Sequence, residues 1–159
     1  MPKAVGKTSD HDGTCKHLVI DASGLVLGRL ASVAAKYLLE GTMLTIVNAE
    51  KAVVTGDRLE IMREAHMELR IRNLGTKSKS PKHARRPEGI VRRTIRGMLP
   101  RDKAKGKDAF SHLRVYSGAP DGVDSASAVK PEEAENRSLV RLTTVGEIAQ
   151  SIGWKPLEA

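Results

Sequence analysis

Residues 17–49, HLVIDASGLVLGRLASVAAKYLLEGTMLTIVNA, contain a strand, a helix and a second strand in that order. The apolar run 17–21 is too short for a helix and ends in a Gly-containing turn, which indicates a buried strand. Over residues 27–40 the apolar positions recur at helical spacing, and Gly41 stands where a left-handed helix stop is expected. Residues 43–49 are again apolar and β-branched. This succession predicts an α/β fold whose parallel strands are joined by right-handed crossovers.

Further elements follow along the chain. Residues 52–54 and 113–116 have strand patterns, and the second of these could return to the sheet. A second helix is expected over residues 57–73, with one apolar side buried. That side would comprise Leu59, Met62, Ala65 or His66, and Leu69. A terminal helix should begin near Thr144, because Glu147 completes a capping-box spacing, and it should bury Val145, Ile148 and Ile152.

The charge of the chain is concentrated in one segment. Of 27 Lys and Arg residues, 14 lie between Arg70 and Lys107, where the only acids are Glu88 and Asp102, so this basic segment has a net charge near +12. The remainder of the chain has a net charge of about −4. Like charges held together on a folded body indicate a polyanion-binding surface, and nucleic acid is the expected polyanion.

The basic segment divides into parts. Residues 76–86 have no apolar face to bury, so they should form an exposed loop that orders on binding. Pro87 and Pro100 bracket a predicted helix with one apolar and one arginine face, and a short helix should follow towards Phe110. The predicted nucleic-acid contacts are Arg70, Arg72, Lys77, Lys79, Lys82, His83, Arg85, Arg86, Arg92, Arg93, Arg96, Arg101, Lys103, Lys105 and Lys107.

A solvated helix face and a membrane-binding helix both fit this segment less well than a nucleic-acid surface does. A solvated helix face would contain intrahelical ion pairs, which two acids among fourteen cations cannot supply. A membrane-binding helix would have an aromatic anchor on its apolar face, and this one has none. An aromatic content of 3% also disfavours base stacking.

The sequence does not predict an enzyme. The turn at residues 24–30 lies where a phosphate-binding loop would lie, but it lacks both the Gly-x-Gly-x-x-Gly pattern and a Lys-Ser or Lys-Thr pair. No catalytic triad can be identified, and the histidines are too far apart to suggest a metal site. We therefore expect no catalytic residue, metal, cofactor or small-molecule substrate. With a single cysteine, Cys15, and no apolar leader or span, the chain is expected to be soluble, intracellular and reduced.

Three regions are expected along the chain. Residues 1–16 lack apolar periodicity and should be flexible, residues 17–122 should form the core domain with the basic segment, and residues 123–159 should form a C-terminal extension with the terminal helix. The acidic stretch 132–135 and the terminal helix could instead form a protein-interaction surface. That alternative stays open beside nucleic-acid binding.

Several blocks match a known family in order and spacing. They are IDA at 20–22 with LGRLAS at 27–32, NAEKAVVTG at 48–56, RTIRGMLP at 93–100 and LRVYSG at 113–118. Over residues 17–122 the chain thus resembles the universal large-subunit ribosomal protein thirteen family, and PKHARRP at 81–87 resembles its archaeal and eukaryotic branch.

The resemblance implies a three-layer α/β/α domain with a small, mainly parallel central sheet and a basic loop-helix insertion. It also implies a cytoplasmic protein of the large ribosomal subunit that binds ribosomal RNA, touches neighbouring ribosomal proteins and supports assembly without catalysis. The basic segment would then neutralise RNA phosphates, and selectivity would rest on RNA shape.

Overall fold

The structure of the chain is a computed structural model, and it describes residues 16–120, 128–136 and 141–156. The segment 1–16 that was predicted to be flexible lies outside the described residues, apart from Lys16. In chain order the helices, strands and short 3-10 helices (η) are β1 (His17–Asp21), α1 (Leu27–Leu39), β2 (Met43–Val47), η1 (Ala49–Lys51), β3 (Val53–Thr55), α2 (Arg58–Arg70), η2 (Lys77–Lys79), α3 (Pro87–Met98), α4 (Ala104–Ser111), β4 (Leu113–Val115), η4 (Glu132–Ala134), β5 (Leu142–Thr144) and α5 (Val145–Ser151).

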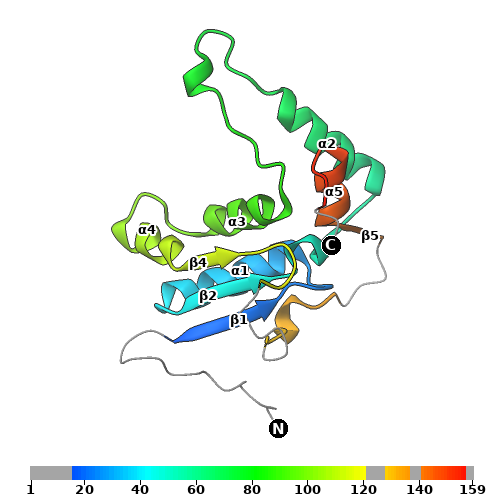
Figure 1. The fold of residues 1–159 in the computed structure, drawn as a ribbon. Coiled ribbons are helices and arrows are strands. Elements are labelled where there is room, and N and C mark those ends of the chain that lie inside the picture. The colour runs from blue at the N-terminus through cyan, green and yellow to red at the C-terminus, as the bar shows by residue number, and fades with distance from the viewer. Residues whose placement is uncertain (1–15, 121–127, 137–140, 157–159) are drawn as a thin grey trace.

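A small parallel sheet lies at the centre of the molecule (Figure 1). Its order is β1-β2-β4, and both neighbours of β2 run parallel to it, with Ile46 in register with Ile20 on one side and Val115 on the other. Residues 44–47 of β2 are all buried, as is typical of a central strand covered on both faces. The α/β class and the parallel sheet are therefore confirmed.

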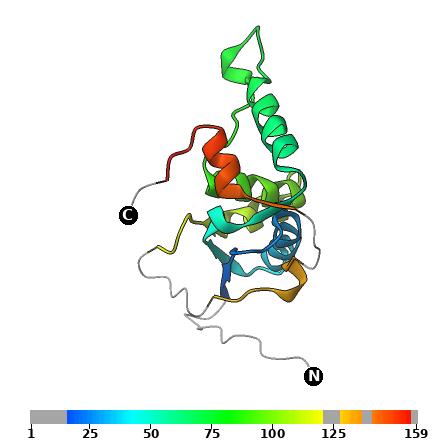
Figure 2. The same cartoon turned by 90° about the vertical axis from the view of Figure 1, so that its right-hand side faces the viewer.

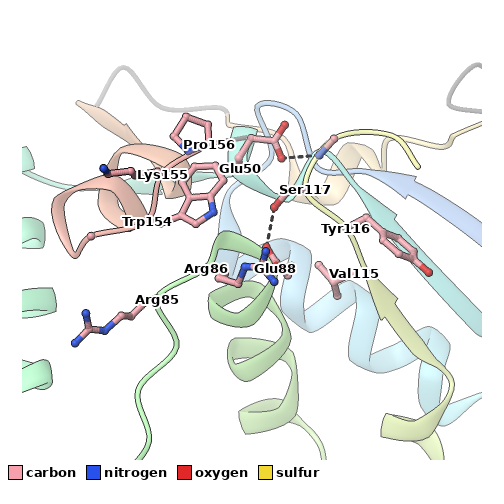
Figure 3. A pocket seen from close by; sticks show the side chains of 12 residues that line it. Glu50, Arg85, Arg86, Glu88, Val115, Tyr116, Ser117, Trp154, Lys155 and Pro156 are labelled. Atoms are coloured by element: carbon pink, nitrogen blue, oxygen red, sulfur yellow. Dashed lines mark hydrogen bonds and ion pairs between the residues drawn. The ribbon is translucent and has the colours of Figure 1, made fainter. Parts of the chain in front are cut away.

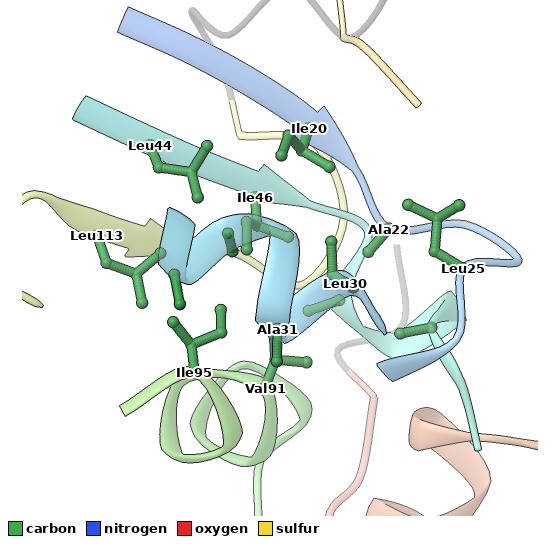
Figure 4. Packing of buried hydrophobic residues seen from close by; sticks show 14 of the residues in the cluster. Ile20, Ala22, Leu25, Leu30, Ala31, Leu44, Ile46, Val91, Ile95 and Leu113 are labelled. Carbon is green, nitrogen blue, oxygen red and sulfur yellow. The ribbon is translucent and has the colours of Figure 1, made fainter. Parts of the chain in front are cut away.

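The core joins this sheet to two helices (Figure 4). Helix α1 buries one side, which includes Leu30, Ala31 and Ala34, against residues of the sheet. Helix α3 adds Val91 and Ile95, both fully buried, to the same cluster. Each such side chain contributes about 1.5–3 kcal/mol through burial. The predicted Pro-bracketed helix is thus an integral part of the core.

Strand β3 does not join the parallel sheet. It pairs antiparallel with β5, a strand that the sequence did not predict, and Val53 is in register with Thr144. Strand β5 has only three residues and leads directly into α5, so it is too short to show a period-two pattern.

The start of the terminal helix predicted at Thr144 is confirmed, and Thr144 is its N-cap. The backbone N–H of Glu147 donates to Thr144 Oγ1 at 3.2 Å, and α5 begins at Val145. Val145, Ile148 and Ile152 are buried as expected. Val145 belongs to the main core cluster, together with Ala134 from η4.

The prediction for the second helix was wrong in its burial. Helix α2 ends at Arg70, before the predicted end at residue 73, and none of its residues is buried. Leu59 is 70% exposed and Met67 61% exposed. Helix α2 lies beside α5 and rises from the body, carrying the following loop away from the sheet (Figures 1 and 2). Its inner side, which includes Met62, Ala65 and Leu69, is therefore only half-buried.

A network of hydrogen bonds joins the carboxyl ends of β1 and β2. Asp21 Oδ1 accepts from Ser23 N at 3.1 Å, from Ser23 Oγ at 2.7 Å and from Asn48 Nδ2 at 2.9 Å, while Asp21 Oδ2 lies 3.2 Å from Lys130 Nζ. Burial by itself raises the pKa of the Asp21 carboxyl, but these hydrogen bonds and Lys130 outweigh it and lower the pKa to about 2. The strand-end network of Asp21, Ser23, Asn48 and Lys130 therefore favours the charged carboxylate.

This pKa predicts an acid-dependent part of the stability. Because the folded pKa lies below the ordinary value of 3.8, the stabilisation is present above about pH 5 and is lost as the pH falls from about 4 towards 2. Asp21→Asn should lower the free energy of unfolding by about 2 kcal/mol at pH 7, and this difference should nearly vanish at pH 2. Chemical denaturation at several pH values measures it.

The matched control is Asp57→Asn, which removes an exposed ion pair with Arg141. It should cost no more than about 0.5 kcal/mol at any pH. A difference between Asp21→Asn and the parent chain that stays constant from pH 7 to pH 2 would contradict the role given to the carboxylate.

Candidate nucleic-acid interface

The fifteen predicted contact residues lie on two neighbouring surfaces. The first is the basic arm, residues 70–86, with Arg70, Arg72, Lys77, Lys79, Lys82, His83, Arg85 and Arg86. The second is the α3–α4 surface, residues 92–107, with Arg92, Arg93, Arg96, Arg101, Lys103, Lys105 and Lys107. His83 is partly buried, and every other residue of this set whose side chain is described is exposed.

A few polar contacts shape the basic arm. The backbone N–H of Asn73 donates to Ser80 Oγ at 3.2 Å, and Asn73 Nδ2 donates to the carbonyl of Lys79 at 3.4 Å. The ring Nε2 of His83 lies 3.4 Å from the carbonyl oxygen of Ile71. These contacts close the arm on itself, and none of them buries a basic side chain.

Helix α3 has the two faces that the sequence predicted. Val91 and Ile95 are fully buried, whereas Arg92, Arg93 and Arg96 are exposed on the other side. Since the apolar face is fixed in the core, the three guanidinium groups are displayed on a rigid helix. A guanidinium can donate two parallel hydrogen bonds to one phosphate.

Two contacts set α4 against α3. The guanidinium carbon of Arg92 lies 4.9 Å from the ring centre of Phe110, a cation–π contact between the two helices. At the start of α4, a Cβ added to Gly106 would lie 2.0 Å from the carbonyl oxygen of Pro100. Glycine therefore permits the close approach of α4 to the turn that follows α3.

The basic surfaces contain little opposing charge. Glu88 is engaged within the chain, because its carboxylate lies 3.3 Å from Arg86 Nε and accepts from Ser117 Oγ at 2.8 Å. It also lies in the first turn of α3, where the helix dipole favours an anion. Asp102 is the other acid of the segment and is exposed.

Metal sites and membrane spans are not found in the part of the chain that the structure describes. There, no three His, Cys, Asp or Glu side chains are grouped so that they could hold a metal ion. None of the described helices is long and apolar enough to cross a membrane.

Comparison with known proteins identifies the family. A family model described as Ribosomal protein L13 matches residues 15–121, which include the whole parallel sheet and both basic surfaces. The chain belongs to the ribosomal protein L13 family.

Archaeal members of the L13 family resemble the chain over most of its length. Large ribosomal subunit protein uL13 of Methanococcoides burtonii is 45% identical over 139 residues, covering 86% of this chain and 98% of the relative. The uL13 proteins of Aeropyrum pernix and Methanosarcina barkeri are 39% and 44% identical, covering 90% and 86% of this chain and 94% and 98% of the relatives. The predicted archaeal type of the family is thereby confirmed. The alignments cover a larger fraction of this chain than residues 1–121 make up, so the similarity includes part of the chain after residue 121.

Several candidate contacts in this L13 chain lie outside the segment defined by charge. Lys36 of α1 and Lys105 of α4 line one shallow depression together with Met98. Lys155 and Trp154, near the C-terminus, line a cleft together with Arg85 and Arg86 of the basic arm. Local charge density could not reveal these residues, because only the fold brings them to the basic surfaces.

The close approach at Gly106 can be tested by stability. Gly106→Ala should lower the free energy of unfolding by about 1–3 kcal/mol, because the added methyl group must displace backbone rather than a flexible side chain. The matched control is Gly97→Ala in α3, where an added Cβ meets nothing within 4 Å. That change should be neutral or stabilise by up to about 1 kcal/mol. Equal urea-denaturation midpoints for the two variants would contradict the proximity of Gly106 to Pro100.

Proposed function

We propose that the chain is a structural constituent of the large ribosomal subunit that binds ribosomal RNA through the basic arm and the α3–α4 surface. The observation that carries the proposal is the membership in the L13 family together with the fourteen Lys and Arg residues of the two basic surfaces. The only acids in the same segment of sequence are Glu88 and Asp102. The archaeal proteins that resemble this chain are named as proteins of the large ribosomal subunit. The role is architectural, in subunit assembly and translation in the cytoplasm, and includes no catalysis.

The two basic surfaces would act in different ways. The α3–α4 surface is held rigidly, so its arginines would meet phosphates with little loss of conformational freedom. The basic arm has few internal contacts and would order as it binds, so its ordering would offset part of the gain. Most of the affinity in both would come from release of counterions from the RNA backbone.

Neighbouring ribosomal proteins are proposed as further partners. Helix α2 and the residues after it expose apolar side chains, of which Leu59, Met67 and Leu74 are 70%, 61% and 99% exposed. Such surface favours a protein contact in an assembly. The acidic stretch 132–135 is anchored through Ala134, which is buried and whose carbonyl accepts from Val26 N at 2.9 Å. Its three glutamates are exposed, so it would offer a second surface for a protein partner.

The salt dependence of RNA binding tests the α3–α4 surface. Replacing Arg92, Arg93 and Arg96 together by Gln should weaken binding to a large-subunit RNA fragment. It should also reduce the slope of log affinity against log salt by roughly one for each phosphate that the variant no longer neutralises.

The matched control replaces Arg58, Arg63 and Arg141 by Gln, which removes the same charge from arginines that are exposed and paired with acids. It should leave the slope nearly unchanged. If both triple variants flatten the slope equally, net charge and not the α3–α4 surface determines binding.

Amide exchange tests the ordering of the basic arm. Amides of residues 76–86 should exchange rapidly in the free chain, since Lys79 N to Thr76 O is the only backbone hydrogen bond described within this stretch. The same amides should be protected in purified large subunits. Amides of residues 91–95, which lie in the interior turns of helix α3, should be protected in both states and serve as the internal reference. Arm amides that exchange equally fast in both states would overturn folding on binding.

A further inference from the structure

A cleft of about 740 Å³ lies where three distant segments of the chain meet (Figure 3). The segments are residues 85–88 of the basic arm and α3, residues 115–118 after β4, and residues 153–156 after α5, with Glu50 beside them. The cleft therefore lies at the carboxyl ends of β2 and β4, the edge of a parallel sheet at which ligands bind in open α/β folds. Its volume is within the range of about 300–1,000 Å³ found for ligand sites.

Aromatic side chains are concentrated at this cleft. The chain has only four, and two of them are used inside the protein: Tyr37 packs against the core, and Phe110 lies under Arg92. The other two, Trp154 and Tyr116, are both lining residues of the cleft, and the ring of Tyr116 points away from Trp154 (Figure 3). Trp154 is partly exposed, and Tyr116 is 38% exposed. Both rings therefore keep accessible surface.

Backbone hydrogen bonds hold the two aromatic residues in place. Trp154 N donates to the carbonyl of Ala149 at 2.9 Å, in a helix stop that Gly153 makes possible with a φ of 97°. Tyr116 N donates to the carbonyl of Ile46 at 2.9 Å, which attaches it to the central strand. The rings are thus presented from ordered backbone.

The charges around the cleft favour an anion. Arg85, Arg86 and Lys155 are exposed at its rim. Two acids also line it: Glu50 Oε2 accepts from Gly118 N at 2.9 Å, and Glu88 accepts from Ser117 and pairs with Arg86. Three cations therefore face two carboxylates, and Arg85 and Lys155 are the cations outside this ion pair. Aromatic faces with cations beside them are the chemistry that binds an unpaired nucleotide, since the base stacks and the phosphate meets the cations.

We propose that this cleft binds a single unpaired nucleotide of RNA, with its base stacked on Trp154 or Tyr116 and its phosphate held by Arg85, Arg86 or Lys155. The proposal rests on the proposed RNA-binding function and adds to it a base-contacting site. It also departs from the expectation, based on aromatic content alone, that base stacking is disfavoured.

Trp154 is the only tryptophan, so its fluorescence reports on the cleft alone. The probe is a single-stranded oligoadenylate of about six nucleotides, which is a typical site size for such binding. It should quench Trp154 emission in the full chain and saturate, whereas an RNA duplex of similar length should bind through the basic surfaces with much less quenching.

Variants separate stacking from charge and from misfolding. Tyr116→Leu and Trp154→Leu should each weaken binding of the labelled oligoadenylate about tenfold, measured by anisotropy. Tyr116→Phe and Trp154→Phe keep a ring and should bind nearly as the parent does. Arg86→Gln should also weaken binding, and Arg141→Gln, a distant exposed arginine, should not. Thermal melts of all variants verify that they are folded.

The outcomes distinguish this proposal from the one on which it rests. Duplex binding that depends on Arg92, Arg93 and Arg96, without quenching of Trp154 by oligoadenylate, would overturn the cleft site and leave the proposed function standing. Leu variants that bind oligoadenylate as tightly as the parent would also overturn it. Absence of binding to either RNA would overturn both proposals.

Discussion

The hydrogen bond from Asn48 to Asp21 is the contact on which the arrangement of the rest depends. It joins the carboxyl ends of β1 and β2, and it holds the turn that begins at Asn48, whose φ of 55° is left-handed. From this turn, Asn48 N donates to the carbonyl of Gly118 and Ala49 N to the carbonyl of Tyr116, so the segment after β4 is fixed as well. Gly146 of α5 approaches so closely that an added Cβ would lie 3.0 Å from the carbonyl oxygen of Glu50. One turn thus positions three strand ends and the terminal helix.

The same core explains how a crowded positive surface is tolerated. Arg92 and Arg96 are like charges one helical turn apart, which costs about 0.2–0.5 kcal/mol. Burial of Val91 and Ile95 on the opposite side of α3 contributes about 1.5–3 kcal/mol each, so packing outweighs repulsion. The basic arm has no such burial, and its like charges are relieved by solvation and distance instead. The packed α3–α4 surface and the arm with its few internal contacts thus differ because apolar side chains are available to the first and not to the second.

Local patterns in the sequence predicted those features that neighbours along the chain determine. Strand β1, helix α1, the two faces of α3 and the helix start at Thr144 each need only a few adjacent residues, and all are found. The failures have a common physical cause. Helix α2 has the spacing of a buried helix, but whether a core faces it depends on the rest of the fold, and β3 found its partner in a strand of three residues near the end of the chain. The basic residues could be selected by charge, whereas the cleft lined by Arg85, Tyr116 and Trp154 could not, because only tertiary structure unites them.

Aromatic content is an average over the whole chain, whereas base stacking depends on where the individual aromatic side chains lie. A chain with four aromatic residues cannot offer a broad stacking platform, yet two rings held by backbone hydrogen bonds are enough to receive one base. The proposed phosphate contacts on the basic arm and α3 would weaken steeply as salt rises, because they would depend on counterion release. Stacking in the cleft depends less on salt, and it requires a base that is free of a duplex. Electrostatic attraction would therefore bring the protein to the RNA over a wide surface, and the cleft would fix its register at a single nucleotide.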